Sequence, residues 1–241
     1  MISKRGFPYI SLTAPTTGKA MLVIVFCIAG ATLGARLLHV GMAPVIESNS
    51  TWMRAVTAVC LLLCGAALAF LRGAGPQPLK SAVARTAGIV VGAVALLTLL
   101  TYLVEIFSGH ESPLAQWPIF LFMVTPFRMS IITAILFLLF AGVLLLLGRP
   151  GRRAATAAHT ALLPIALITY FVLIGYLFKV QTLYEWLYPA IALSSGIAFL
   201  ALTLAAFTLR PDSWITETFS GDKPALSWPE GSCPPLFFSR L

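Results

Sequence analysis

Charged residues are scarce in this sequence. Asp, Glu, Lys and Arg make up 10% of the 241 residues, whereas hydrophobic residues make up 59%. Soluble globular domains have about 25% charged residues, so water cannot be the main solvent of this chain. The hydrophobic residues also lack the alternation that the strands of a membrane β-barrel would show. The composition therefore excludes an ordinary soluble domain and indicates a helical protein in a lipid bilayer.

Residues and motifs that carry catalysis or bind metals are also few. The four cysteines form no disulfide framework, and helix packing explains Cys60 and Cys64, which share a helix face. His39, His110 and His159 do not lie at the matched depth that a haem site in the membrane requires. Neither a phosphate-binding Gly-rich loop nor a Gly-x-Ser-x-Gly elbow occurs. We therefore expect no metal, no cofactor and no enzymatic activity.

The sequence does contain six hydrophobic blocks, each close to the roughly 17–25 residues that a helix needs to cross a bilayer. They run approximately over 20–38, 55–71, 86–107, 130–147, 162–178 and 188–209. We predict an all-α polytopic membrane protein whose six transmembrane helices form three hairpins within residues 20–209. A segment of residues 1–19 and a short tail of residues 210–241 flank this membrane domain. Pro164 is expected in the first turn of the fifth helix, where proline is tolerated.

Basic residues are distributed unevenly between the two sides of such a helical array. Twelve of the sixteen Lys and Arg residues fall in the N-terminal segment, the loops 72–85 and 149–153, and the tail. Because cytoplasmic loops retain Lys and Arg, both termini are predicted on the cytoplasmic side of a bacterial inner membrane. The net charge of +8 follows from this topology, so we expect the bilayer, and not nucleic acid, as a partner. The basic loops are also suited to contact with anionic lipid.

Ionisable residues near membrane depth are the first candidates for function, because they are costly there unless they are paired or hydrated. Glu105, near the outer end of the third block, and Arg128, before the fourth, are predicted at similar depth. Both an ion pair that only fixes the hairpin and a ligand contact fit this spacing. The outer face gathers further candidates with several Trp and Tyr residues, as a ligand vestibule or an aromatic belt would. These candidates are Arg36, Arg54, Lys179 and Glu185.

Small residues mark predicted contacts between helices. Gly30 with Gly34, and Gly88 with Gly92, have the four-residue spacing that lets two membrane helices approach closely. The second helices of the three hairpins also look alike, because each has a small or hydroxyl-bearing residue near its start and an Arg at its end. A triplicated hairpin and a chance likeness between apolar helices both explain this pattern.

Two stretches resemble the N-terminal membrane region of bacterial sensor histidine kinases and diguanylate cyclases. They are YLVEIFSGHESPLAQWPIF (102–120) and RMSIITAILFLLFAGVLLLL (128–147). The third hairpin adds GYLFKVQTLYEW (175–186) and the exit segment LRPDSWITETFSGDKPA (209–225). The resemblance covers roughly residues 86–225.

This resemblance implies an input module that passes a conformational change through its last helix to cytoplasmic PAS, kinase or cyclase domains. It carries over Glu105, Arg128 and Tyr176 as candidate ligand-binding residues. The sequence departs from the pattern at 131–132, where Pro-Asn is usual, and at Ser194, where a His is frequent. A phosphoacceptor His box, ATP-binding boxes and a Gly-Gly-Asp-Glu-Phe sequence are all lacking.

We therefore expect a non-catalytic membrane sensor, as a stand-alone or truncated relative of that region, that relays a signal to a protein partner. The partner would be a kinase or cyclase, or a second copy of the chain in a homodimer. An accessory or scaffolding subunit of a larger membrane complex is the first alternative. A small-solute transporter or channel is the second, and the scarcity of polar residues at mid-membrane depth places it last.

Overall fold

The computed structural model describes residues 15–38, 53–73, 76–108, 129–178 and 191–209. In these ranges the chain forms six helices and no strand, which confirms the all-α fold class for the described residues. The helices are α1 (Pro15–Leu38), α3 (Ala55–Arg72), α4 (Gln77–Ser108), α5 (Ile131–Leu147), α6 (Arg152–Leu177) and α8 (Leu193–Phe207). Four of them, α1, α3, α4 and α6, are long and apolar enough to cross a membrane. The other two, α5 and α8, are shorter apolar helices.

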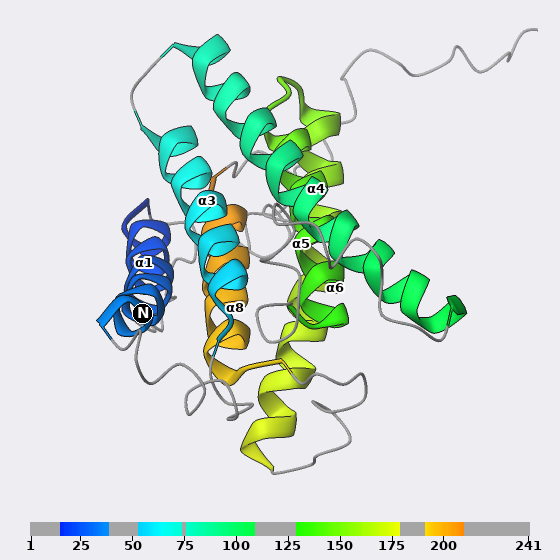
Figure 1. Ribbon diagram of the computed structural model, residues 1–241. Coiled ribbons are helices and arrows are strands. Elements are labelled where there is room, and N and C mark those ends of the chain that lie inside the picture. The colour runs from blue at the N-terminus through cyan, green and yellow to red at the C-terminus, as the bar shows by residue number, and fades with distance from the viewer. Residues whose placement is uncertain (1–14, 39–52, 74–75, 109–128, 179–190, 210–241) are drawn as a thin grey trace, which may run out of the picture.

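The six helices pack side by side as a closed ring (Figure 1). Each helix contacts the next one in chain order, and α8 returns to contact α1. In addition, α3 contacts α5 and α8 across the ring. Short connections join α3 to α4 and α5 to α6, so the members of each of these pairs run in opposite directions.

Buried side chains make up the largest share of α3, α5 and α8. Phe137 of α5 and Phe199 of α8 are both fully buried, and their ring centroids lie 4.7 Å apart with an angle of 57° between the planes. A tilted pair of this kind contributes about 0.5–1.5 kcal/mol beyond the burial of its area. Outward faces instead expose large apolar side chains, such as Ile89 and Val23. Apolar exposure on this scale suits a surface in contact with lipid.

Two helices begin nine or more residues earlier than the hydrophobic blocks predicted, while α1 begins at Pro15, where the sequence predicted residue 20, and α8 begins at Leu193, where it predicted residue 188. α4 begins at Gln77, where the sequence predicted residue 86, and α6 begins at Arg152, where it predicted residue 162. Hydrophobicity marks only the apolar part of a helix, and polar residues continue both helices beyond it. Because α6 begins so early, Pro164 lies in the interior of the helix. The expectation that Pro164 lies in a first turn was therefore wrong.

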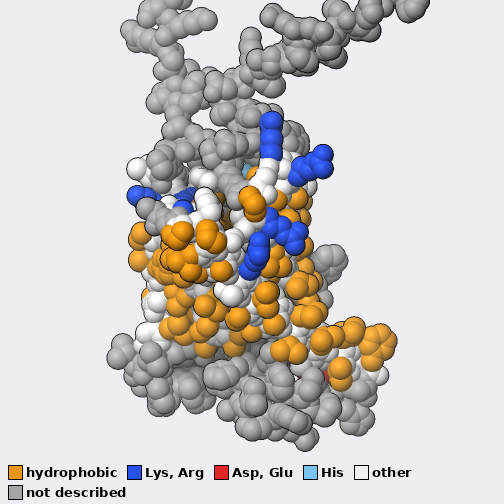
Figure 2. Space-filling view, turned by 90° about the horizontal axis from the view of Figure 1, so that it is seen from above, with side chains coloured by type: hydrophobic (Ala, Val, Ile, Leu, Met, Phe, Trp, Pro, Cys, Tyr) orange, Lys and Arg blue, Asp and Glu red, His pale blue; other side chains and the backbone are white. Residues whose placement is uncertain are grey.

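Positive charge gathers at one end of the ring, which we call the basic end. Here α3, α5 and α8 end and α1, α4 and α6 begin. Its described Lys and Arg side chains are Lys19, Arg72, Lys80, Arg85, Arg149, Arg152 and Arg153. Figure 2, seen from above, shows Lys and Arg side chains gathered on this end. The opposite end holds Arg54 and Glu105, and Glu105 is the one acidic residue in the described ranges.

Candidate functional site

The opposite end of the ring holds the candidates that the sequence placed at the outer face. Arg54 precedes α3 in an extended conformation and is half-buried. Glu105 is also half-buried, in the last turn of α4, next to the strongly exposed Ile106 and Phe107. Figure 1 shows this end of α4 projecting away from the other helices. Outside the described residues lie Arg128, Lys179 and Glu185, and also the side chain of Arg36. The predicted pairing of Glu105 with Arg128 therefore stays a prediction.

Tyr176 of α6 makes a hydrogen bond between helices. Its hydroxyl donates to the carbonyl oxygen of Ile191, just before α8, at 2.5 Å. Tyr102 of α4 makes the equivalent bond to the carbonyl oxygen of Met129, just before α5, at 3.0 Å. Each tyrosine thus ties the outer part of one helix to the start of the next helix. The hydroxyl of Tyr176, a predicted ligand-binding residue, therefore makes a structural hydrogen bond between α6 and the residue before α8.

Replacing Tyr176 by Phe is expected to lower the free energy of unfolding by about 1 kcal/mol, because one buried acceptor loses its donor. The control is Tyr170→Phe on the same helix, where the side chain is 56% exposed and the expected change is within about 0.5 kcal/mol. Thermal unfolding in a mild detergent, followed by intrinsic fluorescence, measures both. Equal losses in the two variants would contradict the structural role of the Tyr176 bond.

The two glycine pairs occupy different environments. A Cβ atom added at Gly88 would lie 3.1 Å from the carbonyl oxygen of Ala141 in α5, and one added at Gly92 would lie 3.2 Å from the Cβ of Ala141. At Gly30 and at Gly34, an added Cβ would meet none of the described residues within 4 Å. Gly88 and Gly92 therefore lie at a close contact between α4 and α5. Gly30 and Gly34 have the same spacing but lie on a face of α1 that no described helix covers, which we call the open face of α1.

The basic end contains a contact that the sequence pattern did not single out, which we call the Arg72 clasp. Arg72, the last residue of α3, donates from Nη2 to the carbonyl oxygen of Ala205 at 2.6 Å and to Thr208 Oγ1. Its guanidinium also lies against Gly18 of α1, where it leaves no room for a side chain. The second terminal nitrogen, Nη1, is buried. One side chain thus joins α1, α3 and the end of α8.

His159 holds the same end of α8 from the other side. The sequence placed it at the start of the fifth helix, and the structure places it in α6, completely buried. Its ring stacks on Phe207 of α8, with centroids 5.4 Å apart and planes 5° apart. The end of α8 therefore packs against the ring of His159 and accepts hydrogen bonds from the guanidinium of Arg72.

Sequence reasoning missed the clasp because it counted Arg72 only as one of the basic residues that set the topology. Ala205 lies 133 positions away in the chain, and no local pattern pairs residues over that distance. The one available signal was the Arg that ends each of the three similar helices. That signal shows a recurring cation, but it does not show which carbonyl the cation contacts.

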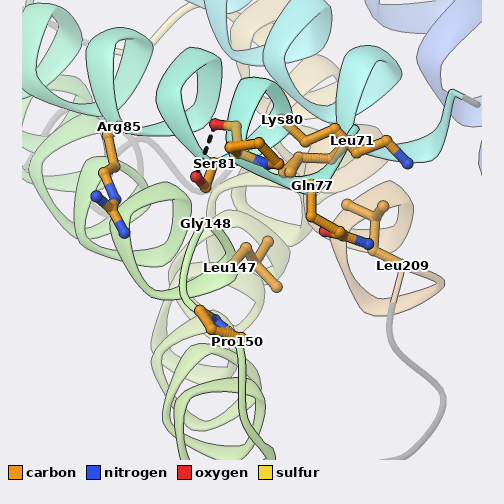
Figure 3. Close-up of a pocket in the computed structure, with 10 residues that line it drawn as sticks. Leu71, Gln77, Lys80, Ser81, Arg85, Leu147, Gly148, Pro150 and Leu209 are labelled. Carbon is orange, nitrogen blue, oxygen red and sulfur yellow. Dashed lines mark hydrogen bonds between the residues drawn. The ribbon is translucent and has the colours of Figure 1, made fainter. Parts of the chain in front are cut away.

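A pocket of about 470 Å³ also opens at the basic end (Figure 3). Its apolar wall comes from the end of α3, from the end of α5 with the turn that follows it, and from Leu209, two residues after the end of α8. These residues are Leu71, Leu147, Gly148, Pro150 and Leu209. Its polar wall is the start of α4, with Gln77, Pro78, Lys80, Ser81 and Arg85. The described part of the lining holds two cations and no acidic residue, so its chemistry suits an anion.

Comparison of the chain with protein families, with curated proteins and with solved structures found no match. The resemblance to the sensor-kinase input region is therefore carried by the quoted sequence stretches alone. It stays a prediction, as do the site residues that it implies.

Proposed function

We propose that this chain is a non-catalytic sensor module with six membrane spans and both ends in the cytoplasm, and that it relays a signal to a protein partner through α8. The observation that carries the proposal is the Arg72 clasp. A relay needs a helix end that two arrangements of the bundle hold differently. The clasp holds the end of α8 through one polar side chain, which a small shift of α3 or α1 can release.

The position of α8 in the ring supports the same proposal. It contacts α1, α3 and α6, so a rearrangement at the opposite end has three routes to the end of α8. The carbonyl of Ile191, before α8, accepts the hydrogen bond of Tyr176, while Ala205 and Thr208 at its other end accept those of Arg72. Each end of α8 thus accepts hydrogen bonds from a side chain of a neighbouring helix, and the ring of His159 packs on Phe207 at the Arg72 end.

Six spans require α5 and α8 to cross the membrane although they are short. Their 17 and 15 residues correspond to about 26 and 22 Å of helix, against a hydrocarbon core of about 30 Å. α4 and α6 are long candidate spans that begin at the basic end, and α5 ends there beside the start of α6. This arrangement supports a return crossing by α5 between them. Burial of α5 and α8 among longer neighbours, with local thinning of the bilayer, would accommodate the difference.

The test is affinity purification of the tagged chain from its native host in a mild detergent, followed by mass spectrometry. A bound kinase, cyclase or response regulator is the expected result. Arg72→Gln should then change the activity of that partner, whereas Arg149→Gln, an exposed cation at the same end, should leave it unchanged. If the activity of the partner is unchanged in both variants, the relay through α8 is contradicted.

The open face of α1 favours a second candidate function, an accessory subunit that joins a larger membrane complex. Gly30 and Gly34 lie on this face, and the exposed Cys27 lies one turn before Gly30. Mild oxidation of membranes in a Cys233→Ser background tests it, since Cys60 and Cys64 are buried. A disulfide from Cys27 to a different polypeptide, present in fixed ratio, would support this candidate. A disulfide only between two copies, or none, would contradict it.

A further inference from the structure

The pocket at the basic end combines two kinds of wall. One wall is apolar and includes Leu71, Leu147 and Leu209 at the ends of hydrophobic helices. The other wall is the first turns of α4, with Lys80, Ser81 and Arg85 (Figure 3). Its volume of about 470 Å³ lies within the roughly 300–1,000 Å³ typical of ligand sites. A ligand that fills it must have an anionic part next to an apolar part.

Among the described residues, the charge around the pocket is of one sign. Lys80 and Arg85 line it, and Lys19, Arg72 and Arg149 lie at the same end of the ring. The one acidic residue of the described ranges is at the opposite end. A concave surface with cations and low-dielectric walls concentrates anions, and phosphate accepts bonds from both ammonium and guanidinium groups.

The backbone at the start of α4 adds to this attraction. The N–H groups in the first turn of a helix have no acceptor within the helix, and the helix dipole places partial positive charge there. In α4 this turn begins at Gln77 and also lines the pocket. The Lys80 N–H is already bonded to the carbonyl oxygen of Pro76, and Pro78 has no N–H, so the start of α4 contributes mainly the positive end of its dipole.

We propose that this pocket binds the phosphate ester of an anionic phospholipid at the start of α4, where Lys80 and Arg85 supply positive charge from opposite sides of the pocket (Figure 3). The glycerol and the first acyl carbons would then lie against the leucines of the apolar wall. The pocket lies where apolar helices end and cations begin, which is the level of the headgroups for helices that cross a bilayer. Inorganic phosphate could make the same polar contacts, but it has no apolar part to contact the leucines of the apolar wall.

The test uses the full chain in nanodiscs that contain phosphatidylcholine with a minor fraction of phosphatidylglycerol or cardiolipin. Native mass spectrometry counts the lipids that remain bound. Lys80→Gln with Arg85→Gln is expected to lower retention of the anionic lipid about tenfold, since the two pocket cations would lose direct charge-assisted contacts with the phosphate. Arg152→Gln with Arg153→Gln removes the same charge from the same end outside the pocket lining, and is expected to change retention less than about twofold.

Ser81→Asp separates loss of the site from loss of the fold. An acid near the start of a helix is favourable for the helix, so this variant should unfold no more easily than the wild type. It nevertheless places negative charge in the pocket and should release the anionic lipid. Equal loss in both paired variants, or retention of anionic lipid by Ser81→Asp, would overturn the proposal. So would inorganic phosphate that displaces the lipid at equal concentration, because the site would then be one for a soluble anion.

Discussion

Replacing Arg72 by Ala is expected to lower the free energy of unfolding by about 2–3 kcal/mol, because two hydrogen bonds from a charged donor are lost. The acceptors, the carbonyl of Ala205 and the hydroxyl of Thr208, lie on a different helix from Arg72. The loss therefore weakens the packing of α3 on α8. Titration of the detergent-solubilised protein with a denaturing detergent, followed by circular dichroism, measures the change.

The matched control for this prediction is Arg149→Ala. Arg149 is an exposed cation at the same end, so its loss should change the free energy of unfolding by no more than about 0.5 kcal/mol. Thr208→Val completes a double-mutant cycle with Arg72→Ala, in which the two changes should not be additive because they remove one shared contact. Additive changes, or an equal loss in the Arg149 variant, would mean that the clasp does not hold α8.

Replacing Gly88 by Leu is expected to cost about 3 kcal/mol of unfolding free energy, because the new side chain forces α4 away from α5. An added Cβ alone would lie 3.1 Å from the carbonyl oxygen of Ala141 and 3.3 Å from the Cγ of Leu145. A backbone oxygen cannot move aside as a side chain does, so the helices themselves must separate. The same denaturing titration measures the effect.

The control is Gly30→Leu, which has the same chemistry at the open face of α1. No atom of the described ranges lies within 4 Å of a Cβ at this position, so the stability of the single chain should change little. If α1 joins another polypeptide, this variant should lose that partner during purification and still unfold like the wild type. A destabilisation by Gly30→Leu as large as that by Gly88→Leu would contradict the contrast between the two glycine pairs.

The sequence by itself determined which segments are helical and where charge gathers. A block of about twenty apolar residues must satisfy its backbone internally in lipid, and a helix does so without help from neighbours. Each of the six blocks accordingly overlaps one of the six helices, although α1, α4 and α6 begin earlier than their blocks and α8 begins later. The gathering of Lys and Arg at one end could also be predicted, because each of these residues lies in a short segment beside a hydrophobic block.

Only the tertiary structure decided which faces of these helices meet. A helix that is apolar on all sides carries no stripe to mark its packing face, and contacts in lipid depend on the fit of small surfaces. For this reason Gly30 and Gly88 looked equivalent in the sequence, although one is open and the other lies against α5. The return of α8 to α1, the Arg72 clasp and the pocket beside Lys80 all depend on contacts between distant segments. Hydrophobicity drives such segments into the bilayer, but the close fit of their side chains selects their partners.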